Sequence, residues 1–62
     1  MNNRITFRSV VHKDAIGVYL KSRGRILARP VGHSTVLPGS LVRCKLRPTT
    51  VIVNDEVWQR FE

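Results

Sequence analysis

Apolar and basic residues alternate one for one between positions 41 and 47 of the chain. Successive side chains of a β-strand point to opposite faces, so half of this stretch would face a core and half would face outward. The inward residues are Val42, Cys44 and Leu46, and the outward residues are Arg43, Lys45 and Arg47. The pattern predicts a strand with a basic outer face, bounded by the structure-breaking segment Pro38-Gly39-Ser40 and by Pro48.

The segment Arg4–Val11 alternates in the same way. Its apolar face holds Ile5, Phe7 and Val11, and its polar face holds Arg4, Thr6 and Arg8. The β-branched and aromatic residues favour a strand, and the polar segment His12–Asp14 that follows predicts a turn.

Residues 14–24 fit two structures. As a strand, they place alternate apolar side chains, including Ile16, on one face and turn around Gly24 into a second strand. As a helix, they begin at an Asp14 cap and end before a left-handed Gly24. Gly17 costs a helix about 1 kcal/mol relative to alanine, so we favour the strand and keep the helix as the alternative.

The rest of the chain predicts a loop, a strand and a closing helical turn. We expect a long loop over Pro30–Ser40 with a short strand at Ser34–Leu37, and then a buried strand at Thr50–Val53. Asn54 would cap a final helical turn, because the acidic residues after it suit the positive end of a helix dipole. The apolar side chains of that turn, which would cover one open end of a barrel, are Val57, Trp58 and Phe61.

These elements together predict a mainly all-β fold. We expect a single domain over residues 1–62, built as a small five-stranded SH3-like or OB-like barrel with a short C-terminal helical turn. A domain of 62 residues buries only about 60% of the surface of its unfolded chain, so its stability is marginal. The single cysteine, Cys44, excludes an intrachain disulfide, and we therefore expect a homo-oligomer.

The charge is strongly positive and unevenly distributed. Eleven Lys and Arg stand against four Asp and Glu, for a net charge of +7. Residues 1–50 hold ten of the basic residues and one acid, whereas residues 51–62 hold one basic residue and three acids. Such a field attracts nucleic acid, anionic membranes or an acidic protein. No apolar run is long enough for a signal peptide or a membrane span, so we expect a cytoplasmic protein that does not bind membranes.

Basic and aromatic residues define a candidate nucleic-acid site. Side chains two positions apart on a strand lie about 6.5 to 7 Å apart, close to two phosphate steps along one nucleic-acid strand. A basic stripe could therefore neutralise successive phosphates, a basic hairpin could extend the contact, and an aromatic ring could stack on a base. The candidates are Arg43, Lys45 and Arg47 in the stripe, Lys21, Arg23, Arg25 and Arg29 around the hairpin, Arg8, and Tyr19 as the stacking ring. The competing interpretation is a solvated face whose charges prevent edge pairing.

The chain offers little for catalysis or metal binding. His12 and His33 lack acidic or cysteine neighbours at metal-ligand spacing, and no Ser-His-Asp set can be assembled. No glycine-rich phosphate loop is present, and three of the four acids lie in the last eight residues. Cys44, on the apolar side of its strand, should be a packed small side chain rather than a reactive thiol. We therefore expect no enzymatic activity, no metal and no cofactor.

Two short segments resemble the CsrA/RsmA family of small post-transcriptional RNA-binding dimers. Ile26–Gly32 is similar to the opening strand of that family, and Val51–Phe61 is similar to its last strand and first helical turn. The resemblance implies RNA binding. The two segments cover under a third of the chain, and their spacing is too short for the family's middle strands, so we do not assign the chain to it.

These observations predict a small basic module that binds RNA or DNA mainly through backbone contacts, as a regulator or accessory factor in gene expression or replication. The alternative is a protein-interaction module, an inhibitor or assembly factor that docks its basic face on an acidic protein.

Overall fold

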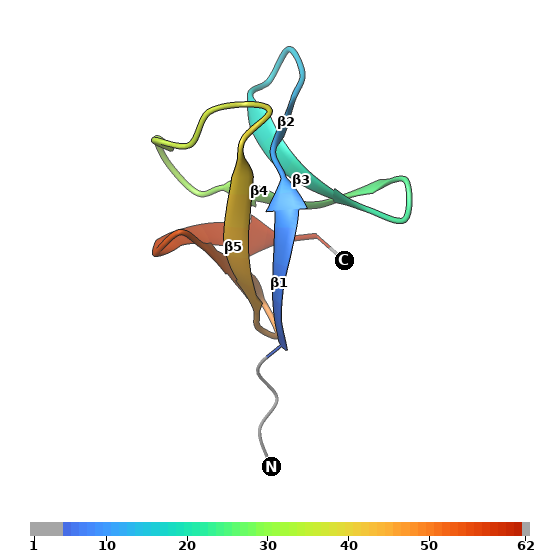
Figure 1. The fold of residues 1–62 in the computed structure, drawn as a ribbon, viewed down its shortest axis with the longest axis vertical. Helices are drawn as coiled ribbons and strands as arrows, with labels where there is room; N and C mark the ends of the chain where they lie inside the picture. Colours follow the sequence, from blue (N-terminus) through green and yellow to red (C-terminus); the bar gives the residue numbers. More distant parts are fainter. Residues whose placement is uncertain (1–4, 62) are drawn as a thin grey trace.

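The computed structural model describes residues 5–61, which form seven strands and no helix (Figure 1). The strands are β1 (Ile5–Val10), β2 (His12–Lys13), β3 (Val18–Ser22), β4 (Arg25–Pro30), β5 (Leu41–Leu46), β6 (Thr50–Val53) and β7 (Glu56–Arg60). Every neighbouring pair is antiparallel, in the order β1-β5-β6-β7-β4-β3-β2. The prediction of an all-β fold is confirmed. The predicted five strands and C-terminal helical turn are corrected to seven strands and no helix over the described range.

Val11 is the residue at which the sheet curls round. β1 ends just before it and β2 begins just after it, so the two edge strands are consecutive segments of the chain. The backbone N–H of Val11 donates to the carbonyl of Ser40 at 2.9 Å, and its carbonyl accepts from the N–H of Gly39 at 2.7 Å. The buried Val11 side chain packs in the core. The sheet therefore forms a curled half-barrel rather than a closed five-stranded barrel (Figure 1).

The turn predicted at residues 12–14 lies further along the chain. His12 and Lys13 form β2 and pair with Tyr19 and Val18. The turn begins at Asp14, whose Oδ1 accepts hydrogen bonds from the backbone N–H groups at positions 16 and 17, at 3.0 and 3.2 Å. A short polar side chain that accepts from the backbone in this way favours a turn. The prediction that Ile16 faces the core is wrong, because this turn leaves it 81% exposed.

The β3–β4 hairpin confirms the strand interpretation of residues 18–22 and removes the helical alternative. Its two turn residues, Arg23 and Gly24, have φ angles of 53° and 77°. Two residues with positive φ make a type I′ turn, whose twist matches that of the flanking strands. The hairpin projects to the right of the sheet in Figure 1.

The helical turn predicted after Asn54 is wrong. Asn54 and Asp55 have φ angles of 46° and 69°, so they form a two-residue hairpin turn between β6 and β7. Asn and Asp tolerate this left-handed conformation better than other non-glycine residues. After the turn, the side chains alternate as in a strand: Trp58 is fully buried, and Val57 and Phe61 are about half exposed. These three residues therefore do not form a lid.

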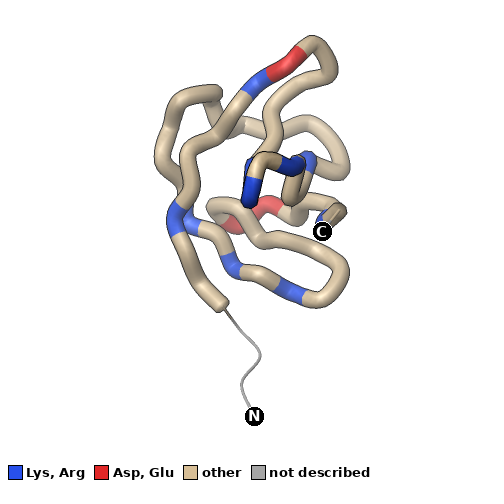
Figure 2. The backbone as a smooth tube through the Cα atoms, turned by 90° about the vertical axis from the view of Figure 1, so that its right-hand side faces the viewer, with Lys and Arg blue, Asp and Glu red and all other residues tan. Residues whose placement is uncertain are grey.

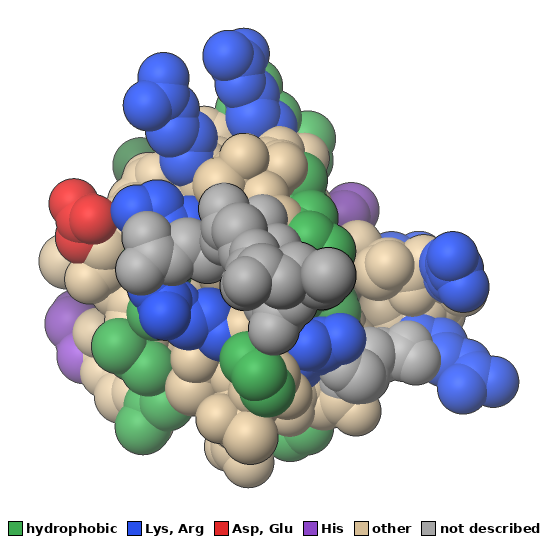
Figure 3. All heavy atoms as spheres, turned by 90° about the horizontal axis from the view of Figure 1, so that it is seen from below, with side chains coloured by type: hydrophobic (Ala, Val, Ile, Leu, Met, Phe, Trp, Pro, Cys, Tyr) green, Lys and Arg blue, Asp and Glu red, His purple; other side chains and the backbone are tan. Residues whose placement is uncertain are grey.

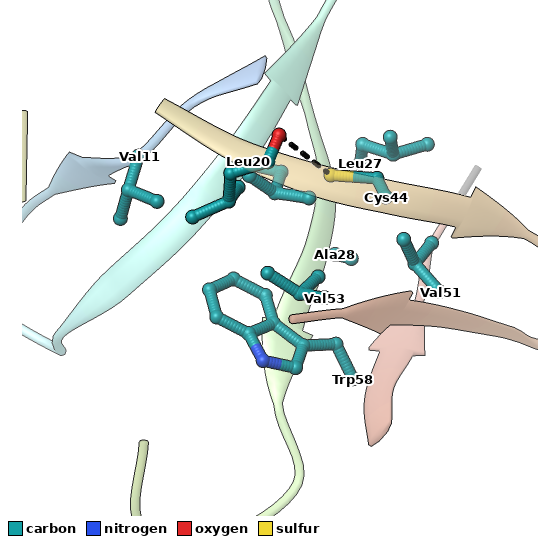
Figure 4. Close-up of a cluster of buried hydrophobic side chains, with 9 residues drawn as sticks. Val11, Leu20, Leu27, Ala28, Cys44, Val51, Val53 and Trp58 are labelled. Atoms are coloured by element: carbon teal, nitrogen blue, oxygen red, sulfur yellow. Dashed lines mark hydrogen bonds between the residues drawn. The ribbon is translucent and has the colours of Figure 1, made fainter. Parts of the chain in front are cut away.

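The core lies on the inner face of the curled sheet. Figure 4 shows buried side chains from several strands gathered beside the indole of Trp58. The buried residues are Val11, Leu20, Leu27, Ala28, Val42, Cys44, Val51, Val53 and Trp58. The predicted inward positions of β5 are confirmed, since Val42 and Cys44 are buried and Leu46 packs against them. Truncating a buried Trp to Ala typically costs about 3 to 5 kcal/mol, which would remove much of the stability of a small domain.

Glu56 anchors the loop that covers one end of the core. Its carboxylate accepts hydrogen bonds from the hydroxyl of Ser34 at 2.7 Å and from the N–H and hydroxyl of Thr35 at 2.9 and 2.7 Å. It also accepts from the indole N–H of Trp58 at 3.0 Å. The hydrogen bonds from Ser34 and Thr35 are the main cause that lowers the pKa of Glu56 to about 2. The short strand predicted at 34–37 is absent from the structure, and this loop is held by the carboxylate instead.

Candidate nucleic-acid interface

The outer face of β1 and β5 carries a cluster of cations. The register places Arg8 directly opposite Arg43 and Thr6 opposite Lys45, all with exposed side chains. Like charges directly opposite each other on neighbouring strands destabilise the pair. Over residues 5–61, no carboxylate lies within ion-pair distance of these three cations. We call Arg8, Arg43 and Lys45 the outer cationic face.

The backbone of Arg43 is held in place by the β6–β7 turn. The N–H of Arg43 donates to Oδ1 of Asn54 at 3.1 Å, and the N–H of Asn54 donates to the carbonyl of Arg43 at 3.0 Å. A shallow hollow of about 310 Å³ lies between this turn and the cations, with Asp55 on its wall. Another of about 350 Å³ lies between β1 and β5 and is lined by all three cations of the outer face. The surface around the cations is therefore recessed on both sides of β5.

Arg47 lies just beyond the end of β5, with an exposed side chain. Its backbone N–H donates to the carbonyl of Thr50 at 3.0 Å, and its carbonyl accepts from the guanidinium Nη1 of Arg60 at 2.7 Å. The structure thus places Arg47 in the β5–β6 turn, at the end of the stripe that includes Arg43 and Lys45.

A second group of cations lies on the β3–β4 hairpin. Figure 2 shows basic positions on this hairpin, which points toward the viewer, and along β5 below it. Lys21, Arg23 and Arg25 all have exposed side chains. A hollow of about 540 Å³ separates the hairpin from β1, and it is lined by Lys21 and Arg23 on one side and by Arg8 on the other. Arg8 therefore belongs both to the outer cationic face and to the wall that faces the hairpin.

Arg29 and Tyr19 form a separate cluster with the β2–β3 turn. Nη2 of Arg29 lies 2.6 Å from Oδ2 of Asp14, and Nη1 donates to Oδ1 at 3.2 Å. This guanidinium is the main cause that lowers the pKa of Asp14 to about 2, and the same bond raises the pKa of Arg29. Arg29 also lies 5.1 Å from the ring centroid of Tyr19, which stacks on His12 at 5.5 Å. The Arg29 charge is therefore matched by a carboxylate, and the Tyr19 ring already has two partners.

Arg60 is a residue of the site that the sequence analysis missed. It lines the hollow between the hairpin and β1, together with Arg8, Lys21 and Arg23. The signal was the pair Asn54–Asp55, because Asn and Asp both tolerate the positive φ of a two-residue hairpin turn. A strand in place of the expected helical turn would have directed Arg60 toward β4 and the hairpin.

Three further observations concern metal binding, thiol reactivity and membrane-crossing helices. Over the range 5–61, no three of the side chains His, Cys, Asp and Glu lie together as a metal site would require. Burial raises the pKa of the Cys44 thiol to about 11, which keeps it protonated and poorly nucleophilic. In the same range, no helix is long and apolar enough to cross a membrane. Arg4 and Glu62, which enter the predicted charge pattern, lie outside the described residues.

Comparison of the chain with protein-family models, curated proteins and solved structures found no match.

Proposed function

We propose that this protein binds nucleic acid chiefly through the phosphate backbone, with the outer cationic face as the principal contact. The observation that carries the proposal is the cross-strand pair Arg8 and Arg43, with Lys45 beside it and no carboxylate within ion-pair distance among residues 5–61. Bringing these charges together costs stability unless an anion approaches them. A phosphate backbone supplies anions about 3.4 Å apart along the axis, so the roughly 6.5 to 7 Å between side chains two positions apart on a strand spans about two phosphate steps.

The proposed role is that of a small accessory factor or regulator in gene expression or replication. Binding through phosphates gives affinity with little sequence preference. The basic hairpin with Lys21, Arg23 and Arg25 extends the contact beyond the outer cationic face. Arg29 contributes little, because Asp14 already neutralises its charge.

Fluorescence anisotropy with a labelled 20-nucleotide single strand tests this proposal. Arg43→Glu should weaken binding by about tenfold or more, because one phosphate contact is lost and a repulsion replaces it. Lys13→Glu, which changes the net charge equally but lies on β2, should change affinity by less than about threefold. Changing Arg43, Lys45 and Arg47 together to Glu should abolish binding. Equal losses for Arg43→Glu and Lys13→Glu would overturn the proposed face.

A competition experiment separates nucleic acid from the alternative partner, an acidic protein. Unlabelled single strand should displace the labelled probe, and polyglutamate at the same charge concentration should displace it far less, because its carboxylates lack the fixed phosphate spacing. If polyglutamate displaces the probe as effectively as nucleic acid does, the proposal is contradicted and the alternative, an acidic protein partner, is favoured.

A further inference from the structure

The half-barrel has an open seam between β1 and β3. Among the described strands, β1 pairs only with β5. Within the same set of strands, residues 20–22 of β3 pair only with β4, so one edge of each strand is left unpaired along the seam. β1 and β3 approach each other without pairing, because the chain bends at Val11. The hollow of about 540 Å³ lies along this seam. We call it the seam groove.

The walls of the seam groove combine an apolar floor with a cationic rim. The floor residues are Ile5, Phe7, Leu27 and Leu46, and the rim residues are Arg8, Lys21, Arg23 and Arg60. No Asp or Glu of residues 5–61 lines it. Ile5 is 57% exposed although it lies on the inner face of β1. Figure 3 shows exposed hydrophobic side chains between Lys and Arg side chains on the face seen from below, with acidic side chains visible at one edge.

The Arg60 side chain adds an unused hydrogen-bond donor to this wall. Its Nη1 donates to the carbonyl of Arg47 at 2.7 Å, but its Nε, which is buried, has no acceptor among residues 5–61. A buried donor without a partner costs free energy, so an acceptor that reached this Nε would stabilise the complex.

We propose that the seam groove takes one or more unpaired bases of a single-stranded nucleic acid whose backbone lies on the outer cationic face. This inference rests on the proposed function and names its substrate class. A base has apolar faces that suit Phe7 and the aliphatic floor, and polar edges that suit the donors of Arg60. The phosphates on either side of the base meet Arg8 and the hairpin cations. Bases of a duplex are stacked inside the helix, so a duplex offers no free base face to the groove.

Two probes with equal numbers of phosphates test the groove: a single-stranded decamer, and the same backbone with abasic sites throughout. The protein should bind the base-bearing strand at least about fivefold more tightly than the abasic strand, since stacking of one base typically contributes at least that much. Equal binding of the two single strands would overturn the groove proposal and leave backbone binding intact. If neither binds, the proposed function itself fails.

Two variants of the groove floor locate the base. Phe7→Leu should lower the affinity for the base-bearing strand toward that for the abasic strand and leave abasic binding unchanged. Because Phe7 also packs against the core, Ile5→Ser at a half-exposed position is the second variant, with the same expected pattern. Val57→Ser, on the outer face of β7, is the matched control and should leave both affinities unchanged. Loss of base preference in Val57→Ser, or its retention in both floor variants, would overturn the proposal.

Discussion

At the scale of single residues, Glu56 holds the irregular loop between β4 and β5 to the core. One carboxylate accepts from the side chains of Ser34, Thr35 and Trp58 and from one backbone N–H. The donor on Trp58 belongs to the largest side chain of the core, so the same carboxylate holds a loop and satisfies a buried indole. Asp55, the next residue in the chain, is exposed and occupies the turn. The two neighbouring acids therefore make a matched pair for mutation.

Glu56→Gln should destabilise the protein by about 1 to 3 kcal/mol, because the charged acceptor is lost and a buried donor is left poorly satisfied. Asp55→Asn removes the same charge next to it and should be nearly neutral, since Asn tolerates the positive φ of that position. Urea unfolding of both variants at pH 7 checks the expectation. Equal effects of the two changes would show that charge alone, and not the hydrogen bonds, is responsible.

The same carboxylate predicts a loss of stability in acid. The pKa of Glu56 is lowered from 4.5 to about 2 in the folded protein, so its contribution is present in full above about pH 4.5 and is lost as the pH falls toward 2. Urea midpoints measured between pH 7 and pH 2 should fall less steeply for Glu56→Gln than for the unmodified protein. If the urea midpoint of Glu56→Gln falls with pH as steeply as that of the unmodified protein, Glu56 is not the cause of the acid sensitivity.

At the scale of elements, the β3–β4 turn holds a charged residue, Arg23, at a position whose positive φ favours Asn or Gly. Arg23 has a φ of 53°, a conformation in which Asn or Gly is usually found. A non-glycine residue held there costs on the order of 1 kcal/mol and points to a function for its side chain. Arg23 also lines the seam groove. The cost in the turn therefore fits the proposed role of Arg23 as a cation that contacts nucleic acid.

Arg23→Asn should raise stability by about 0.5 to 1 kcal/mol, because Asn-Gly is the preferred pair of a type I′ turn. The same change should weaken binding of a single strand by severalfold, because one cation is lost. Lys21→Asn removes an equal charge from the same hairpin at a position without positive φ, and it should weaken binding without the gain in stability. Thermal unfolding and anisotropy on the same samples measure both effects. If Arg23→Asn is destabilising, or binds as well as the unmodified protein, this account of the hairpin is wrong.

Elements with strict alternation could be predicted from the sequence, and those set by turn geometry could not. β5 and the β3–β4 hairpin follow directly from period-two patterns and from Gly24. The sequence of β7 predicts a helical turn because Asn54 is also a good helix cap, and the choice between turn and helix depends on the φ of the following residue. β2 has only two residues, and it pairs because Val11 bends the chain, which no local pattern reveals.

At the scale of the whole molecule, the distribution of charge is only partly visible in the sequence. Period-two spacing correctly places Arg43 and Lys45 on an exposed face. The cross-strand position of Arg8 and the pairing of Arg29 with Asp14 arise from strand order, so they required the structure. The cations consequently divide into an outer face joined to the hairpin through Arg8, and the separate Arg29 cluster.

The expectation of a homo-oligomer also belongs to this scale and remains a prediction. A chain of 62 residues has a small core, and its exposed large apolar side chains include Val10 and Leu41, which lie opposite each other on β1 and β5. Sedimentation equilibrium should show a dimer or larger species, and Leu41→Lys should shift it toward the monomer because a charge enters the contact. A monomer at all concentrations up to about 100 μM, where even weak specific dimers form, would contradict this expectation.

The salt dependence of single-strand binding tests the central claim most directly. For contacts with at least three phosphates, log K should fall linearly with log salt with a slope of about −2 or steeper. Changing both Arg8 and Arg43 to Gln should make that slope shallower by about 1.4, since each lost phosphate contact contributes about 0.7, and Lys13→Gln should leave it unchanged. An affinity that does not vary with salt, or a slope unaffected by the double change, would contradict a backbone-binding outer face.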